Sequence, residues 1–124
     1  MDKNLLVIED DPDVSLLLCS KASRLHYHCE IDKTGAEWLG KIQKNQPDAI
    51  ILDMDLPKMS GFSILRQLKA NPKYQSIPVF IWSGTSDPEV VEEARKLGAR
   101  AYLSKSEGIE RLFEQLKLPS GKAG

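Results

Sequence analysis

An apolar run that ends in an acid and then meets a turn is the most constraining feature of the chain. Residues 49–52 read Ala-Ile-Ile-Leu, Asp53 follows them, and residues 57–61 contain the proline and glycine of a turn. A short continuous apolar run bounded in this way indicates a strand buried on both faces. Asp53 is therefore predicted at the carboxyl end of a buried strand, where open α/β sheets hold their functional groups.

Three other apolar runs, at about residues 5–8, 78–82 and 101–103, also lead into polar side chains. The side chains that follow them are the acids Glu9, Asp10 and Asp11, the hydroxyl of Ser83 and the amine of Lys105. The carboxyl ends of parallel strands meet at one edge of a sheet, so these groups are expected to lie together. Acids, a hydroxyl and an amine in one place predict a site for a divalent cation and a phosphoryl group.

Strand-like and helical patterns alternate along the whole chain, which predicts a parallel sheet with helices on both faces. The strands are expected at about residues 5–8, 29–31, 49–52, 78–82 and 101–103. Five βα units with right-handed crossovers give a single doubly wound (βα)5 domain, a three-layer α/β sandwich. The domain is assigned to residues 1–118, and residues 119–124 are expected to form a flexible tail.

Start signals and apolar spacing locate the helices. Asp11 is a predicted N-cap with Pro12 at the first helical position, and Thr34-x-x-Glu37 reads as a capping box for the second helix. The residues expected to face the core are Val14, Leu17, Leu18 and Leu25 in the first helix, Trp38, Leu39 and Ile42 in the second, Phe62, Leu65 and Leu68 in the third, Val90, Val91, Ala94 and Leu97 in the fourth, and Ile109, Leu112, Phe113 and Leu116 in the fifth.

Composition excludes several classes of protein. The chain has 124 residues, of which 41% are hydrophobic, and a net charge of −1, so a single globular domain is expected and direct nucleic-acid binding is not. The sequence lacks an apolar run of the ~18 to 20 residues that would span a bilayer. Cys19 and Cys29 have no CxxC spacing, so they are predicted to be buried free thiols in a reducing, cytoplasmic compartment.

The order of these elements resembles the receiver domain of bacterial two-component response regulators over roughly residues 4 to 118. The features shared with that family are the acidic pair Glu9-Asp10, the Asp-x-Asp-Leu-Pro-x-Met-x-Gly block at 53–61, the hydroxyl of Ser83 and the amine of Lys105. The resemblance implies the flavodoxin-like strand order 2-1-3-4-5. It also implies that Asp53 is the phosphoacceptor.

The resemblance assigns a role to each of these residues. Asp10 and Asp53 would hold Mg²⁺ with their carboxylates, Glu9 would hold a metal-bound water, and Asp55 would contribute its backbone carbonyl. Ser83 and Lys105 would each donate to a phosphoryl oxygen. Asp11 lies one position beyond the acidic pair of the family and is expected to act mainly as a helix cap.

Tyr102 is predicted to lie opposite Leu103, at the surface, because successive strand residues alternate between faces. In the family an aromatic residue here moves inward when the hydroxyl residue turns toward the phosphoryl group, so Ser83 and Tyr102 are the implied switch. The chain departs from the family in three places. It has Lys105-Ser106 for Lys-Pro, Ser83-Gly84 for Thr-Ala, and a bulky Trp82 before the hydroxyl.

The implied function is acceptance of a phosphoryl group from a sensor histidine kinase or a phosphotransfer protein, with relay to a downstream output protein or domain. Such a domain is not an enzyme with a separate substrate, although it catalyses its own phosphorylation and dephosphorylation. The resemblance allows a phosphorylation-linked homodimer and implies no membrane partner. Two alternatives stay open: a phosphatase of the haloacid dehalogenase type, which also uses Asp-x-Asp, and a receiver-like interaction module that works without phosphorylation.

Overall fold

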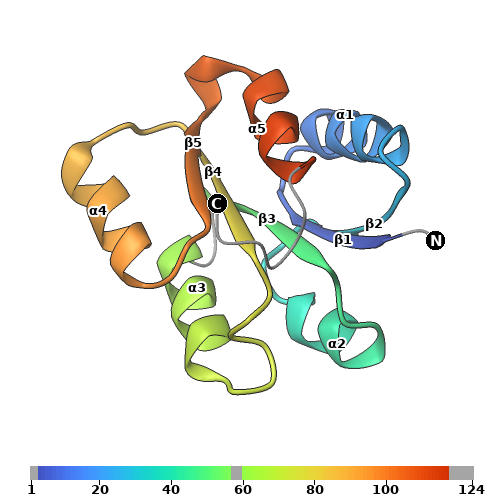
Figure 1. Ribbon diagram of the computed structural model, residues 1–124, viewed down its shortest axis with the longest axis horizontal. Coiled ribbons are helices and arrows are strands. Elements are labelled where there is room, and N and C mark those ends of the chain that lie inside the picture. The colour runs from blue at the N-terminus through green and yellow to red at the C-terminus, as the bar shows by residue number, and fades with distance from the viewer. Residues whose placement is uncertain (1–2, 57–59, 118–124) are drawn as a thin grey trace.

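A parallel sheet with helices on both faces forms the protein (Figure 1). The computed structural model describes residues 3–56 and 60–117, and within these ranges the sheet has five strands in the order β2-β1-β3-β4-β5. The strands are β1 (Lys3–Ile8), β2 (Tyr27–Asp32), β3 (Ala49–Asp53), β4 (Val79–Ser83) and β5 (Ala101–Ser104). The predicted fold class and strand order are confirmed.

The helices divide between the two faces of the sheet. They are α1 (Pro12–Ser23), α2 (Trp38–Lys44), α3 (Gly61–Ala70), α4 (Pro88–Lys96) and α5 (Ile109–Leu116), and a short 3-10 helix, η1 (Lys105–Glu107), precedes α5. Buried side chains of α1 and α5 pack on one face, and those of α2, α3 and α4 pack on the other. The predicted flexible tail at 119–124 lies outside the described residues.

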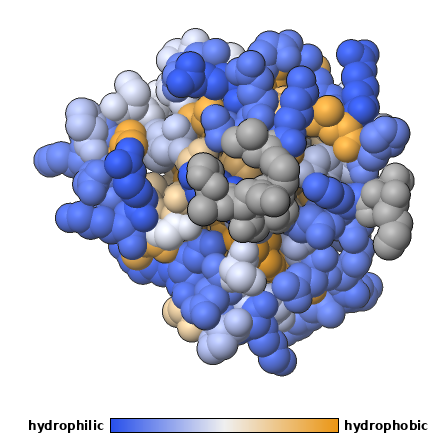
Figure 2. All heavy atoms as spheres, in the orientation of Figure 1, coloured by the Kyte–Doolittle hydropathy of each residue, from blue (hydrophilic) through white to orange (hydrophobic). Residues whose placement is uncertain are grey.

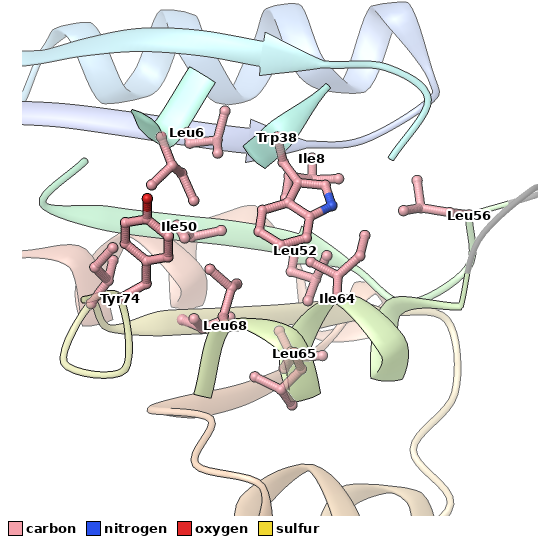
Figure 3. Packing of buried hydrophobic residues seen from close by; sticks show 14 of the residues in the cluster. Leu6, Ile8, Trp38, Ile50, Leu52, Leu56, Ile64, Leu65, Leu68 and Tyr74 are labelled. Carbon is pink, nitrogen blue, oxygen red and sulfur yellow. The ribbon is translucent and has the colours of Figure 1, made fainter. Parts of the chain in front are cut away.

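The central strand β3 shows why a continuous apolar run was needed. Ile50 and Leu52 point to the α2–α3 side, whereas Ala49 and Ile51 point to the α1–α5 side. Both faces are covered, so no polar alternation is tolerated. Figure 3 shows Ile50 and Leu52 meeting Leu65 and Leu68 of α3 in one apolar layer. The surface seen in Figure 2 is mostly hydrophilic, with separate small hydrophobic patches.

Two leucines that were predicted to face the core are exposed. Leu17 is 49% exposed, and Leu39 on α2 is 41% exposed. Three leucines follow one another at positions 16–18, and each turns about 100° from the last, so they cannot all face the sheet. The structure buries Leu18 and leaves Leu16, at 64%, on the outer side.

The predicted capping box at Thr34 and Glu37 is wrong. Helix α2 begins at Trp38, and the Glu37 side chain makes no capping hydrogen bond. The buried carboxylate of Asp32 takes the nearby donors instead. Its Oδ1 accepts from the backbone N–H groups of Thr34 and Gly35 at 2.9 Å each, and its Oδ2 accepts from that of Glu37 at 2.9 Å. Asp32, at the end of β2, therefore fixes the loop before α2, where Thr34 and Glu37 were predicted to form a capping box.

The prediction that the two cysteines are free thiols is also wrong. A disulfide joins Cys19 of α1 to Cys29 of β2, with their Cα atoms 5.6 Å apart. The chain reverses direction between α1 and β2 and packs the helix against the strand, which brings these two positions together. Sequence spacing alone does not show such a pairing. Among the described residues, no helix is long and apolar enough to cross a membrane.

Candidate functional site

Three acids meet at the carboxyl edge of the sheet. Ile8 pairs with Leu52 across β1 and β3, so the residues that follow them in the chain, Glu9 and Asp53, become neighbours. Glu9, Asp10 and Asp53 each offer a carboxylate oxygen, and these oxygens lie within 4.8 Å of one another. Glu9 and Asp53 are each 1% exposed, whereas Asp10 faces solvent. The strand ends therefore form a cluster that is buried on one side and open on the other.

Lys105 supplies the positive charge of the site. Its Nζ lies 3.2 Å from Oδ1 of Asp53, 3.7 Å from Oδ2 of Asp55 and 3.9 Å from Oε1 of Glu9. One ammonium thus faces three carboxylates, two of which are buried. The structure brings Lys105 to the acids as predicted.

The backbone around Lys105 is fixed by a capping box where the family usually has a proline. Ser104 Oγ accepts from the Ser106 N–H at 3.3 Å, and Glu107 Oε1 accepts from the Ser104 N–H at 3.2 Å. The described residues contain no cis peptide bond, so the Lys105–Ser106 bond is trans. A short 3-10 turn therefore directs Lys105 toward Asp53 without a proline.

Asp11 caps α1 and so stands apart from the acidic cluster. Its Oδ1 accepts from the N–H groups of Asp13 at 2.9 Å and Val14 at 3.2 Å. Its own N–H donates to Oε2 of Glu9 at 3.1 Å. The predicted capping role is confirmed, and the same contact joins the start of α1 to the site.

Asp55 uses its side chain more than the sequence analysis predicted. Its Oδ2 accepts from the Gly84 N–H at 2.7 Å and faces Lys105, and its backbone N–H donates to Oδ1 of Asp53 at 2.8 Å. Only the backbone carbonyl of Asp55 was predicted to be a metal ligand, and that role stays a prediction. The signal for the missed contact is the Asp-x-Asp spacing, which places both carboxylates near the strand end.

Ser83 and Tyr102 occupy the two strands on the other side of Asp53. Ser83 is buried at the end of β4, and its Oγ accepts from the Thr85 N–H at 3.2 Å. Tyr102 lies on the opposite side of β5 from Leu103, as predicted. It is half-buried against the α2–α3 layer instead of lying at the surface, and its OH donates to the Thr85 carbonyl at 2.8 Å. Both residues therefore contact Thr85.

Burial and like charge set the protonation of the site. The pKa of Glu9 is raised to about 8: burial is the largest cause and the neighbouring Asp53 carboxylate adds to the rise, whereas the Asp11 N–H and the charge of Lys105 oppose it. Burial alone would lower the pKa of Lys105, but the charges of Asp53, Glu9 and Asp55 outweigh it, so the pKa of Lys105 is raised. The site therefore holds more negative charge than Lys105 can neutralise.

The donor set fits a hard divalent cation. Oε1 of Glu9 and Oδ2 of Asp53 are buried, and neither has a hydrogen-bond partner among the described residues. Unpaired buried carboxylate oxygens are costly, and a cation such as Mg²⁺ prefers oxygen ligands of this kind. These two oxygens and the adjacent carboxylate of Asp10 could hold such an ion, directly or through its bound waters.

Comparison with known proteins decides the family. The sequence matches the response regulator receiver domain over residues 5–117. The chain belongs to this family. Receiver domains accept phosphoryl groups on an aspartate in bacterial two-component phosphorelays, so this chain is a signalling domain. The family does not favour the phosphatase or the phosphorylation-independent module.

The receiver domain has relatives of very different lengths. It is 34% identical to a gliding motility regulatory protein of Myxococcus xanthus over 90% of the chain, but it spans only 14% of that protein. It is 26% identical to the sporulation initiation phosphotransferase F of Bacillus subtilis, covering 94% of this chain and 93% of that one. The crystallised chemotaxis response regulator CheY4 of Vibrio cholerae is 26% identical, with a TM-score of 0.85 and coverage of 94% of this chain and 98% of that one.

Proposed function

We propose that Asp53 is the phosphoacceptor of this receiver domain and that its reaction depends on Mg²⁺. The supporting observation is that Asp53 combines a buried strand-end carboxylate, two neighbouring acids and a Lys105 ammonium at 3.2 Å. Oδ1 of Asp53 accepts from the Asp55 N–H and faces Lys105, whereas Oδ2 has no hydrogen-bond partner. The lone pairs of Oδ2 are therefore unoccupied by protein donors, which suits the proposed cation site.

The reaction is an in-line displacement. An oxygen of Asp53 forms a bond to phosphorus while the bond between phosphorus and the donor breaks, and the departing donor group takes the electron pair and then a proton. Lys105 and the hydroxyl of Ser83 donate to phosphoryl oxygens. Asp10 and Asp53 would hold Mg²⁺, Glu9 would reach it through a water, and Asp55 would add its carbonyl; when bound, the ion neutralises charge on the phosphoryl oxygens. The same residues would then support hydrolysis of the acyl phosphate.

The phosphoryl donor is proposed to be a sensor histidine kinase or a phosphotransfer protein, and the recipient of the signal a downstream output protein or domain. A small acyl phosphate would serve as a donor in vitro. The relay is proposed to pass from Ser83 to Tyr102, which already share a contact with Thr85. We place the domain in the cytoplasm, without a membrane or nucleic-acid partner, and a phosphorylation-linked homodimer is compatible with this function.

Labelling with acetyl phosphate tests the assignment. With Mg²⁺ present, the wild-type chain should gain one phosphoryl group per molecule, located at Asp53 by peptide mapping, and Asp53→Asn should gain none. Chelation by EDTA should abolish labelling of the wild type. Asp10→Asn should weaken Mg²⁺ binding more than its matched control Asp11→Asn, because Asp11 is committed to capping α1. Full labelling of Asp53→Asn, or equal losses in the two variants, would contradict these assignments.

A further inference from the structure

The disulfide between Cys19 and Cys29 connects two elements on the outer side of the fold. Cys19 lies in the second half of α1, and Cys29 lies on β2, which is an edge strand of the sheet. Figure 1 shows α1 running beside β1 and β2. Both cysteines are half-buried against the α1–α5 layer. The function of a receiver domain does not account for this bond.

We propose that the Cys19–Cys29 bond is a reversible redox link, which fixes α1 to the edge strand when oxidised and releases it when reduced. The reductant would be a dithiol. Its first thiolate attacks one sulfur of the bond, the other cysteine leaves as a thiolate, and the second thiolate of the dithiol then displaces the first cysteine. The dithiol ends as a disulfide, and the two cysteines gain two electrons and two protons. A low-molecular-weight disulfide would drive the reverse reaction.

Partial exposure makes the link accessible in the folded chain. An attacking thiolate must approach a sulfur from outside, which is why fully buried cysteines are inert. Neither Cys19 nor Cys29 is fully buried, and β2 has a neighbouring strand on one side only, β1. Exchange therefore does not require the domain to unfold first.

The fold has enough other contacts to survive reduction. Leu18 and Ala22 remain buried in the α1–α5 layer, and β2 pairs with β1 along all six of its residues. The bond closes a loop of only 10 residues in sequence, and a short loop restricts the unfolded chain less than a long one. A reduced cysteine also packs well as a small apolar residue. We therefore expect reduction to loosen α1 locally.

Helix α1 is a consequential element to release. Its inner side carries Cys19, and its outer side carries the exposed side chains of Leu16 and Leu17. Its first turn is capped by Asp11, whose N–H donates to the site residue Glu9. The redox state of the pair thus acts on a helix that reaches from the acidic cluster to an exposed apolar pair.

Reduction under native conditions tests accessibility. The purified chain is treated with dithiothreitol with and without denaturant, free thiols are trapped by alkylation, and the product is weighed by intact mass spectrometry. We expect the native half-time to lie within about tenfold of the half-time in denaturant, because neither cysteine is fully buried. The proposal would be overturned if reduction occurred only in denaturant. It would also be overturned if Cys19 and Cys29 stayed free thiols in glutathione buffers at every ratio of oxidised to reduced glutathione.

Hydrogen exchange tests the effect on α1. Amides of residues 12–23 should exchange at least about fivefold faster in the reduced chain than in the oxidised chain, whereas those of α3 should not change. The double variant Cys19→Ser/Cys29→Ser is the matched control: its α1 should exchange at the reduced rate and should not respond to dithiothreitol. Identical exchange of α1 in the two redox states would show that the bond does not control the helix. Neither assay depends on phosphorylation of the chain.

Discussion

Glu9→Gln should remove a penalty that the metal-free protein carries near neutral pH. The pKa of Glu9 is raised from 4.5 to about 8, so the folded state keeps this carboxyl protonated at pH values where the unfolded chain has released the proton. The folded state therefore binds more protons than the unfolded state between these two values, and the free energy of unfolding falls as pH rises through this window. Above about pH 8 the loss is complete, and below 4.5 it is absent.

The size of the effect follows from the shift and from burial. Each pH unit inside the window costs up to about 1.4 kcal/mol, because one pKa unit corresponds to that free energy. Glu9 is 1% exposed, so solvent does little to reduce the penalty. Between pH 6 and pH 8 we expect the wild type to lose about 2 kcal/mol relative to Glu9→Gln. Glutamine keeps the size of the side chain, cannot ionise, and offers N–H donors to the unpartnered Oδ2 of Asp53.

Urea unfolding in EDTA at several pH values measures this difference directly. Glu110→Gln is the matched control, because Glu110 forms an ion pair with Lys21 but has an 80% exposed side chain. The control should follow the wild type, whereas Glu9→Gln should be flatter with pH and more stable at pH 8. Saturating Mg²⁺ should reduce the wild-type penalty by neutralising the cluster. Parallel curves for the wild type and Glu9→Gln in EDTA would refute the reasoning.

Without metal, Lys105→Met should lower the free energy of unfolding by about 2 kcal/mol, because it leaves two buried acids without their cation. Lys21→Met breaks an exposed pair and should lower it by less than about 1 kcal/mol. Equal losses in urea unfolding would contradict this prediction. Gly61→Ala should cost about 1 to 3 kcal/mol, because an added Cβ would lie 2.8 Å from the Met54 Cα, and an unchanged melting curve would contradict the close contact. Tyr102→Phe removes the hydroxyl that donates to the Thr85 carbonyl. It should therefore reduce the NMR shifts that beryllofluoride and Mg²⁺ induce in β5 and α4. Wild-type shifts confined to the residues around Asp53 would show that no relay passes through β5 and α4.

The strands and the site could be predicted because both depend on local patterns that the fold must respect. The run at 49–52 has to be apolar throughout because both faces of β3 are covered. Glu9, Asp53 and Lys105 follow apolar runs, and parallel strands bring such positions to one edge. Both predictions need only the position at which each apolar run ends, and the sequence shows that position directly.

The errors concern contacts that sequence spacing does not determine. Which of three consecutive leucines faces the sheet depends on how α1 is rotated about its axis, and only Leu18 of the three is buried. The capping box at Thr34 failed because Asp32, at the end of β2, took the donors of the loop. The disulfide needed α1 and β2 to be packed before its two positions became neighbours. In each case a tertiary contact overrode a plausible local pattern.

Asp55 shows how a departure from the family pattern is accommodated. Gly84 stands where the family has alanine, and the wide backbone freedom of glycine would by itself loosen the loop after β4. The structure instead ties the Gly84 N–H to Oδ2 of Asp55 at 2.7 Å, and the same oxygen lies 3.7 Å from Lys105. The Asp55 N–H donates in turn to Asp53 at 2.8 Å. Because Asp55 contacts the acceptor, the lysine and the loop after Ser83, we expect a charge change at Asp53 to alter all three contacts together, and the freedom of Gly84 allows its loop to follow.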